Sequence, residues 1–488
     1  MSRLQERALA GVRSSLRENE GVASMHTTTV MSNTEEKLED PTIAELLTAR
    51  TALDQSSLGL TLDHVSLRDL AGVLGTPVYA YGVDTIGRRL GTMQKAFSAR
   101  GMAPLIAYAV KANDAGGILA CLAERGAGAD VVSEGEMLKA VRSGIKPNDI
   151  VFSGVGKQPE ELASALRWRI RQINIESLAE LDMLSRVASE MDVVAPFAIR
   201  VNPDIDAGTH DKITTGRADS KFGMSQADAV MLARSSRRRS NLRFVGYSVH
   251  IGSQIQDIAP LQAAFRTVAG MARTMLAEGF DLRSLDLGGG VGIPYRPGPS
   301  ISMESYADAV LSEVGELLEQ VGIIVEPGRW IVAPAGVLIT RVILEKETPH
   351  GRVVVVDAGM NDLIRPAMYG AWHGIVPVDP PPGVTQLSPA DVVGPVCESS
   401  DVFAKSRLLP KLAAGSLLAI LDAGAYGAVM SSTYNNRPAA PIALASRGQW
   451  AVARRRETLD ELMARDLSLP GWEDASPQMA PVATSWGT

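Results

Sequence analysis

Short apolar runs alternate with stretches of helical periodicity over roughly the first two thirds of the chain. Residues 177–191 illustrate the helical pattern. Ser177 and Glu180 have the spacing of a capping box, and Leu178, Leu181, Leu184 and Val187 then form one apolar stripe. The runs with strand character are residues 105–110, 129–132, 150–152, 173–175, 197–201, 244–249, 285–287 and 323–325. Eight strands alternating with helices predict an α/β fold with a closed parallel (β/α)8 barrel of the TIM type.

The pattern changes after Arg329, where strand-like runs follow one another without helical periods. These runs cover residues 337–344, 352–356, 391–396, 417–421 and 449–452, and they predict a second, all-β domain. A short strand-like segment at residues 77–81 is expected to join that domain. We therefore divide the chain into a disordered extension (1–45), a leading segment that joins the β domain (46–83), the barrel (84–326), the β domain (327–470) and a tail (471–488).

Polar residues and glycines follow each of the eight predicted strands. In barrels of this type the carboxyl ends of the strands form one rim, and that rim carries the chemistry. Each residue has a structural explanation when taken singly, but together they predict a site on the rim. The residues are Lys111, Asn113, Ser133, Glu134, Ser153, Gly154, Glu176, Ser177, Arg200, Asn202, His250, Ser253, Gly288, Gly289, Gly290, Glu326, Pro327, Gly328 and Arg329.

Lys111 stands out because it directly follows the apolar run 105–110. If the amine is buried there, desolvation lowers its pKa and makes it a nucleophile toward carbonyl compounds. The alternative is an ordinary strand-end lysine that extends to solvent.

A cofactor site follows from the other rim residues. The Gly288–Gly290 triplet allows backbone N–H groups to approach an anion, and with Ser253 it predicts a phosphate site. Adding Lys111, the carboxylate of Glu326 and the flat ring of His250 describes a site for pyridoxal phosphate. A carboxylate keeps the pyridine nitrogen protonated, so that the ring acts as an electron sink.

Composition narrows the class of protein. A net charge of −7 over 488 residues argues against a general nucleic-acid or anionic-membrane binder, and no apolar stretch reaches the roughly 20 residues of a membrane span. Cys121 and Cys397 are the only cysteines, so neither a disulfide framework nor a metal site is predicted, and a cytoplasmic location fits. The amino-terminal residues could alternatively form an amphipathic transit peptide, although Glu6, Glu18 and Glu20 count against it.

Six segments carry a resemblance to a known family: YAVKAN (108–113), VHIGSQ (249–254), GGGVGI (288–293), EPGR (326–329), VGPVCESSD (393–401) and DAGAYG (422–427). In this order they resemble the fold-type III pyridoxal-phosphate decarboxylases of basic amino acids, which share the alanine racemase-like barrel. Within that group the chain is most similar to the diaminopimelate decarboxylases, over about residues 60–444.

The resemblance implies a role for each matching residue. Lys111 would bind the cofactor covalently, His250 would stack on its ring and Glu326 would pair with its ring nitrogen. Cys397 and Glu398 would enter the site across a homodimer interface, with Cys397 as the proton donor to the substrate Cα. The full cofactor-binding set is Lys111, Asp130, Arg200, His250, Ser253, Gly288, Gly289, Gly290, Glu326, Pro327, Gly328, Arg329 and Tyr426, and the catalytic set is Lys111, Cys397 and His250.

Substrate choice depends on Arg365 and Tyr369, which follow the run 357–362. Diaminopimelate carries a second carboxylate that a diamine precursor lacks, and guanidinium is the natural partner for it. Arg329, Arg365, Tyr369, Glu398 and Tyr426 form the predicted substrate set, which favours decarboxylation of meso-2,6-diaminopimelate to L-lysine and CO2, the last step of lysine biosynthesis. The alternatives are a decarboxylase for carboxynorspermidine, arginine or ornithine, or a non-catalytic homologue that binds pyridoxal phosphate. A racemase is disfavoured, because that family sets an arginine against the ring nitrogen and this chain has Glu326.

Overall fold

Within the described residues, eight parallel strands form the closed barrel that the sequence predicts. The computed structural model describes residues 40–56, 59–208, 215–216, 220–379 and 386–466. Every barrel strand begins and ends within two residues of a predicted run, and β12 pairs with β5 to close the barrel. The strands are β5 (Leu105–Ala109), β6 (Gly128–Val131), β7 (Ile150–Phe152), β8 (Gln172–Ile175), β9 (Ala195–Val201), β10 (Leu242–Val249), β11 (Ser284–Asp286) and β12 (Gly322–Val325). The predicted fold class is confirmed.

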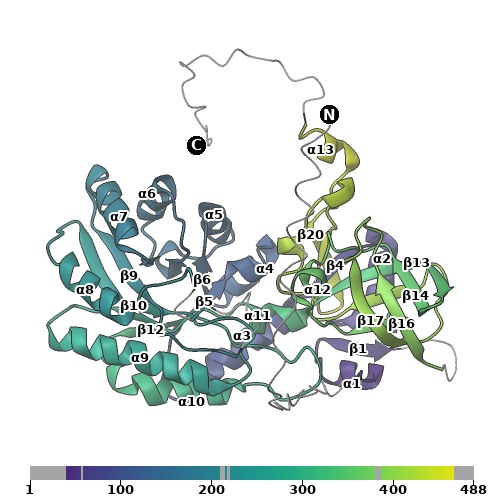
Figure 1. The fold of residues 1–488 in the computed structure, drawn as a ribbon, viewed down its shortest axis with the longest axis horizontal. Helices are drawn as coiled ribbons and strands as arrows, with labels where there is room; N and C mark the ends of the chain where they lie inside the picture. Colours follow the sequence, from purple (N-terminus) through teal and green to yellow (C-terminus); the bar gives the residue numbers. More distant parts are fainter. Residues whose placement is uncertain (1–39, 57–58, 209–214, 217–219, 380–385, 467–488) are drawn as a thin grey trace, which may run out of the picture. The chain divides into compact units, whose positions relative to one another are not determined.

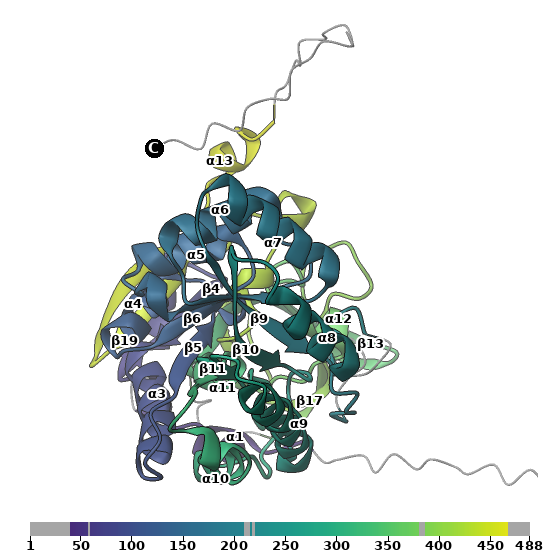
Figure 2. The ribbon, with the colours of Figure 1, turned by 90° about the vertical axis from the view of Figure 1, so that its left-hand side faces the viewer.

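Helices surround the barrel strands (Figure 2). They are α3 (Val83–Ser98), α4 (Gly116–Glu124), α5 (Glu134–Arg142), α6 (Pro159–Trp168), α7 (Leu178–Glu190), α8 (Gln226–Ser236), α9 (Ile258–Ala277) and α10 (Met303–Val314). Ser133 and Ser177 cap α5 and α7 directly after a strand, each accepting a hydrogen bond from a backbone N–H three residues on. Among the helices of the described residues, none has the length and apolarity needed to cross a bilayer.

Helix α7 departs from its prediction in two details. The Glu180 carboxylate accepts the Glu176 N–H at 2.7 Å and does not return to Ser177, so only half of the expected capping box forms. Leu178 is exposed, whereas the other three residues of the predicted stripe are buried. The reason is geometric, since nine steps of about 100° put Leu178 and Val187 on opposite sides of a helix.

Strands from both ends of the described chain form a second domain with a nine-stranded sheet. The sheet order is β17-β16-β14-β13-β4-β19-β20, with β18 paired to β13 and β15 off this path. Strand β4 (Val78–Gly82) precedes the barrel in sequence but pairs with both β13 (Gly336–Thr348) and β19 (Ile442–Ser446). Figure 1 shows β4 among the other strands of the second domain. The other strands are β14 (Gly351–Val356), β15 (Ile375–Pro377), β16 (Ser388–Val393), β17 (Val402–Leu409), β18 (Leu417–Ile420) and β20 (Gln449–Arg454).

The second domain is mostly sheet, in agreement with the predicted β domain. It also contains the short helices α12 (Arg365–Tyr369) and α13 (Leu459–Met463). Strands β15, β17 and β19 were not predicted, because β15 has only three residues and ends in a proline, and β17 and β19 interrupt their apolar residues with polar or small ones.

Within the described residues, regular structure begins at Ile43, before the predicted leading segment. Residues 43–45, assigned above to the disordered extension, belong to α1 (Ile43–Thr48), where Thr42 and Glu45 form a reciprocal capping box and Leu46 is buried. The segment continues with a three-stranded sheet, β1 (Leu53–Ser56), β2 (Gly59–Leu62) and β3 (Val65–Ser66), and with α2 (Leu67–Leu74). Residues 1–39 of the predicted extension and the predicted tail 471–488 lie outside the described residues.

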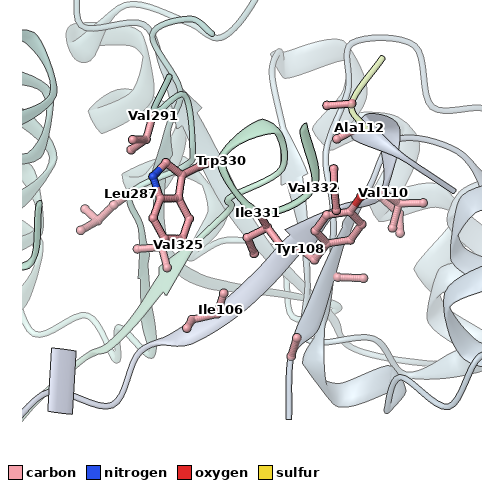
Figure 3. Packing of buried hydrophobic residues seen from close by; sticks show 14 of the residues in the cluster. Ile106, Tyr108, Val110, Ala112, Leu287, Val291, Val325, Trp330, Ile331 and Val332 are labelled. Atoms are coloured by element: carbon pink, nitrogen blue, oxygen red, sulfur yellow. The ribbon is translucent and has the colours of Figure 1, made fainter. Parts of the chain in front are cut away.

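One large apolar cluster joins the barrel strands, their helices and part of the second domain. Figure 3 shows the portion around α11 (Arg329–Val332), where Trp330 and Ile331 lie in a cluster with Leu287, Val325 and Tyr108. This packing fixes the segment after β12, which carries the predicted cofactor residues 326–329.

Candidate active site

A cavity of about 400 Å³ opens at the carboxyl ends of the barrel strands. It is lined by Lys111, Thr215, His250, Ser253, Gln254, Tyr295, Arg329, Arg365, Tyr369, Ala371, Trp372 and Tyr426. Residues from the barrel and from the second domain therefore share one wall. The structure brings together many of the predicted site residues from positions more than 300 apart in sequence.

Lys111 lies on a single turn of 3-10 helix (Val110–Ala112) that follows β5. Its Nζ donates to Oδ2 of Asp130 at 2.5 Å, and a third of the side chain is exposed, while Asp130 on β6 is fully buried. Burial disfavours the charged amine, but the carboxylates of Asp130 and Glu326 outweigh it and raise the pKa of Lys111 above its usual value. The prediction of a lowered pKa is wrong, because it considered desolvation without the neighbouring acids.

Glu326 carries a buried carboxyl whose Oε1 has no hydrogen-bond partner in the described residues. Burial, then Asp130 and Asp286, raise its pKa well above the ordinary value, so this carboxyl binds a proton more strongly than an exposed one. A buried carboxyl oxygen without a partner at the barrel mouth suits a protonated pyridine nitrogen, so the residues present fit pyridoxal phosphate.

A polar chain that the sequence did not reveal supports Glu326 from within the barrel. Asp286 at the end of β11 accepts the Gly288 N–H and the Asn174 amide, each at 3.0 Å, and burial raises its pKa to about 6. The Asn174 amide oxygen in turn accepts from Gln172 at 2.8 Å. Buried polar groups of this kind require partners to avoid a desolvation cost. Only the closed barrel brings these strands together, so no sequence period indicates the chain.

The glycine triplet packs the strand ends tightly. A Cβ on Gly288, Gly289 or Gly290 would collide with a backbone oxygen of Val249, Glu326 or Gly252, respectively. The Gly288 N–H is taken by Asp286, and the Gly289 N–H donates to Nδ1 of His250 at 3.2 Å. Two of the three N–H groups that we expected to face a phosphate thus have protein acceptors. The main role of the glycines is to let neighbouring backbone segments pack closely.

His250 is held as a neutral ring. Since Nδ1 accepts a hydrogen bond from Gly289, that nitrogen is unprotonated. Burial, followed by the positive charges of Arg200 and Lys111, lowers the pKa of His250 well below its usual value. A neutral imidazole on the wall of the cavity suits contact with a flat ring.

Two buried arginines, Arg329 and Arg365, form the part of the cavity wall that we call the arginine wall. Arg329 begins α11, donates to the Tyr295 hydroxyl at 2.7 Å and to Ser253 Oγ at 3.0 Å, and lies 4.7 Å from the ring centre of Tyr426. Arg365 begins α12 and its Cζ lies 4.6 Å from the Tyr295 ring centre. Among the ion pairs of the described residues, none includes either arginine, so both positive charges are available to a ligand.

Tyr426 comes from the loop after β18 and lies directly against the Lys111 turn. Its backbone N–H donates to the Ala112 carbonyl at 2.8 Å, and the Asn113 amide donates to the Gly424 carbonyl at 2.9 Å. These bonds attach the second domain to the barrel rim next to Lys111.

Other predicted residues lie outside the cavity wall. Arg200 pairs with Glu176 at 3.1 Å and stacks over Phe222, which gives it a structural partner. Pro327 and Gly328 contribute backbone contacts. The Pro327 carbonyl accepts the Ala109 N–H, and a Cβ on Gly328 would crowd Ala109 and Ala112.

Cys397 and Glu398 are exposed and lie between β16 and β17. The Cys397 N–H donates to Asn435 Oδ1 at 3.0 Å, and neither residue is among the described residues that line the cavity. One chain therefore does not bring them to Lys111.

The cavity also contains Thr215, Gln254, Tyr295 and Trp372, which the sequence analysis did not select. Gln254 ends the VHIGSQ segment and Tyr295 follows the glycine triplet, so a closer inspection of these rim loops could have found them. Trp372 lies in the second domain, and no pattern in the sequence relates that position to the barrel.

Comparison with known proteins agrees with this geometry. The family model for the pyridoxal binding domain of pyridoxal-dependent decarboxylases matches residues 83–333. A diaminopimelate decarboxylase of Zymomonas mobilis is 42% identical over 423 residues, which cover 85% of this chain and 97% of that protein, and one of Aquifex aeolicus is 42% identical over 412 residues, with 84% and 96% covered. The crystal structure of the Helicobacter pylori enzyme complexed with L-lysine superposes with a TM-score of 0.78 at 42% identity and covers 82% of this chain and 98% of that one. The chain belongs to the diaminopimelate decarboxylase family of pyridoxal-dependent decarboxylases.

Proposed function

We propose that this protein removes one carboxyl group from meso-2,6-diaminopimelate and gives L-lysine and CO2, the last step of lysine biosynthesis. The observation that carries the proposal is the pair of buried guanidiniums, Arg329 and Arg365, that share a cavity with Lys111 and have no carboxylate partner among the described residues. Relatives of more than 40% identity are named diaminopimelate decarboxylases, which supports the same substrate.

Pyridoxal phosphate, when bound, supplies an electron sink for the electron pair left at Cα as the carboxyl group departs. Lys111 would hold it covalently, His250 would lie on its ring, and Ser253, Arg329 and the glycine triplet would surround its phosphate. Glu326, as a carboxylate, would pair with the protonated ring nitrogen. Asp130, 2.5 Å from the Lys111 amine, would hold this amine as an ammonium group until the cofactor enters.

The arginine wall would bind the distal carboxylate of the substrate, which belongs to its second amino-acid group. A guanidinium binds a carboxylate through two parallel hydrogen bonds, and burial strengthens that attraction. Arg329 and Arg365 supply the donors, and Tyr369 and Tyr426 complete the wall. An ornithine- or arginine-specific enzyme has no distal carboxylate for Arg365 to bind.

The complete site would require two copies of the chain. Cys397 and Glu398 are exposed and away from the cavity of their own chain, which is expected if they serve the site of a homodimer partner. There the Cys397 thiol would give a proton to Cα after CO2 leaves, and Glu398 would accept the distal ammonium group. A cytoplasmic location accords with a free thiol in this role.

A substrate panel tests the proposal. CO2 release would be measured from the enzyme with pyridoxal phosphate and meso-diaminopimelate, carboxynorspermidine, arginine or ornithine. We expect turnover of meso-diaminopimelate alone or far above the others. Turnover of ornithine or arginine with inert diaminopimelate would disprove the substrate, and no turnover of any compound would favour a non-catalytic homologue.

A further inference from the structure

His373 lies behind the arginine wall and is completely buried. Helix α12 ends at Gly370 in the left-handed conformation, and the chain then enters β15, which pairs with β18 from Ile375 onward. The Leu421 N–H donates to the Gly374 carbonyl at 2.8 Å. The imidazole is therefore held between a sheet ladder and the first residue of α12, Arg365.

The hydrogen bonds of His373 determine which ring nitrogen carries the proton. Nδ1 lies 2.7 Å from the Leu421 carbonyl oxygen, which can only accept, so Nδ1 must be protonated. Nε2 lies 2.8 Å from Nη1 of Arg365, which can only donate, so Nε2 must be unprotonated. A neutral imidazole with its proton on Nδ1 satisfies both bonds. Burial, then the positive charge of Arg365, lowers the pKa of His373 well below its usual value, in agreement with this assignment.

Because His373 is neutral, it leaves the positive charge of Arg365 uncompensated. Arg365 is buried, and among its described contacts are the His373 imidazole and the face of the Tyr295 ring. Arg329 likewise has the hydroxyls of Tyr295 and Ser253 as partners. Hydrogen bonds to neutral groups orient a guanidinium without cancelling its charge, whereas a carboxylate at position 373 would neutralise Arg365 before any ligand arrived.

We propose that His373 is a positioning residue that sets substrate specificity: its neutral imidazole aims the Arg365 guanidinium into the cavity and leaves its charge for the distal carboxylate of the substrate. This inference rests on the proposed function, because it assigns the partner of Arg365 within the same site. It applies to any ligand that carries an amino-acid carboxylate at that end.

The test uses three substitutions in the enzyme loaded with pyridoxal phosphate. His373→Leu removes the acceptor, His373→Gln retains a neutral acceptor, and His373→Glu introduces a carboxylate next to Arg365. His350→Leu is the matched control, because His350 is an exposed histidine in the turn between β13 and β14.

Losing a hydrogen bond to a charged group predicts a KM for meso-diaminopimelate raised about tenfold or more in His373→Leu, with a smaller change in kcat. We expect the same or a larger rise in KM for His373→Glu, near-normal KM for His373→Gln, and no change for His350→Leu.

A binding measurement separates this inference from the proposed function. L-Lysine and 1,5-diaminopentane differ by one carboxylate, and calorimetry on the loaded enzyme would compare their affinities without turnover. We expect the wild type to prefer L-lysine, and His373→Leu and His373→Glu to lose that preference while binding of 1,5-diaminopentane stays the same. If the preference is lost in a protein that does not decarboxylate diaminopimelate, the inference stands and the proposed substrate fails.

If diaminopimelate is turned over and the preference for L-lysine survives in these variants, the role of His373 is refuted. Should His373→Leu fail to fold, the Gln and Glu variants decide, since they are alike in size and differ in charge. Equal KM values for those two would also overturn the inference.

Discussion

Two lysines near the barrel rim, Lys111 and Lys157, each contact a buried carboxylate. They differ in how many of their N–H bonds are used and in whether the amine is exposed to the cavity. Each Nζ lies 2.5 Å from a buried carboxylate oxygen, of Asp130 and Glu180 respectively. Lys157 also donates to the carbonyls of Gly154 and Asn174, at 2.6 and 2.7 Å, which uses all three N–H bonds of its ammonium group. Its side chain is 1% exposed, compared with 33% for Lys111, which lines the cavity.

Burial and a carboxylate partner are thus insufficient to mark a reactive lysine. Lys157 is a structural cation with saturated hydrogen bonds and no route to a ligand. Among the described residues Lys111 has one hydrogen-bond acceptor, Asp130, and an open cavity on its other side. The carboxyl group of Glu326 also acts on Lys111, and one of its oxygens has no partner there. Lys111, the proposed catalytic lysine, therefore differs from Lys157 in its incomplete set of hydrogen bonds and in its access to the cavity.

Of the substitutions that test the difference between Lys111 and Lys157, Lys111→Ala should have the largest effect on activity. We expect loss of turnover and of the visible absorbance of the bound cofactor, because no other lysine lines the cavity among the described residues. Absorbance spectra and CO2 release would be measured beside Lys157→Met, which should keep the spectrum. Normal activity in Lys111→Ala would refute the mechanism.

Lys157→Met should give the largest effect on stability. Removing one partner of a buried ion pair leaves the other charge unpaired, which typically costs about 3–5 kcal/mol. Chemical denaturation would measure the free energy of unfolding, with turnover expressed per folded molecule. A loss of catalysis that exceeds the loss of folded protein would show that Lys157 has more than a structural role.

Cys397→Ala tests how much of the Lys111 site lies outside a single chain. General acids typically contribute about 100-fold or more to a rate, so we expect kcat to fall by about that factor with cofactor affinity unchanged. A mixture with catalytically inactive Lys111→Ala subunits would check the assignment to the partner, because hybrid dimers should regain one working site. Unchanged kcat in Cys397→Ala would remove the donor role.

Asp130→Asn sharpens the comparison through pH. The raised pKa of Lys111 means that the neutral amine is scarce at pH 7 and increases about tenfold per pH unit, so uptake of pyridoxal phosphate by the stripped protein should accelerate as pH rises. Without the Asp130 carboxylate the pKa of Lys111 falls, and uptake at pH 7 should be about tenfold faster for each unit by which it falls. Stopped-flow absorbance from pH 6.5 to 9 would follow the rate. Identical profiles for both proteins would show that Asp130 does not control this proton.

The sequence was sufficient for the barrel and for the location of its rim. Residues 105–110 and their seven counterparts are short apolar runs with sharp polar ends, and such periodicity is a local property that survives folding unchanged. Lys111, His250, Ser253 and Glu326 could be selected because each directly follows a strand, and strand ends of a parallel barrel meet on one side. The family motifs added Tyr426 and Arg365, which no period relates to the rim.

Other features depended on neighbours that are distant in sequence. The pKa of Lys111 was predicted in the wrong direction, since Asp130 and Glu326 reach it only after the barrel closes. Likewise, α1 was missed because its stability comes from a capping box and the burial of Leu46, and not from a long periodic stripe.

The sequence by itself determined the (β/α)8 architecture, the second domain and the residue types that pyridoxal-dependent decarboxylation requires, because these follow from local periodicity and from residues at strand ends. Only the tertiary structure decided which lysine is open to the cavity, that both arginines keep neutral partners, that His373 stands behind Arg365, and that Cys397 lies away from the cavity of its own chain. The physical reason is that charge, pairing and access are properties of neighbours in space, and β18 with its following loop reaches Lys111 from more than 300 residues along the chain.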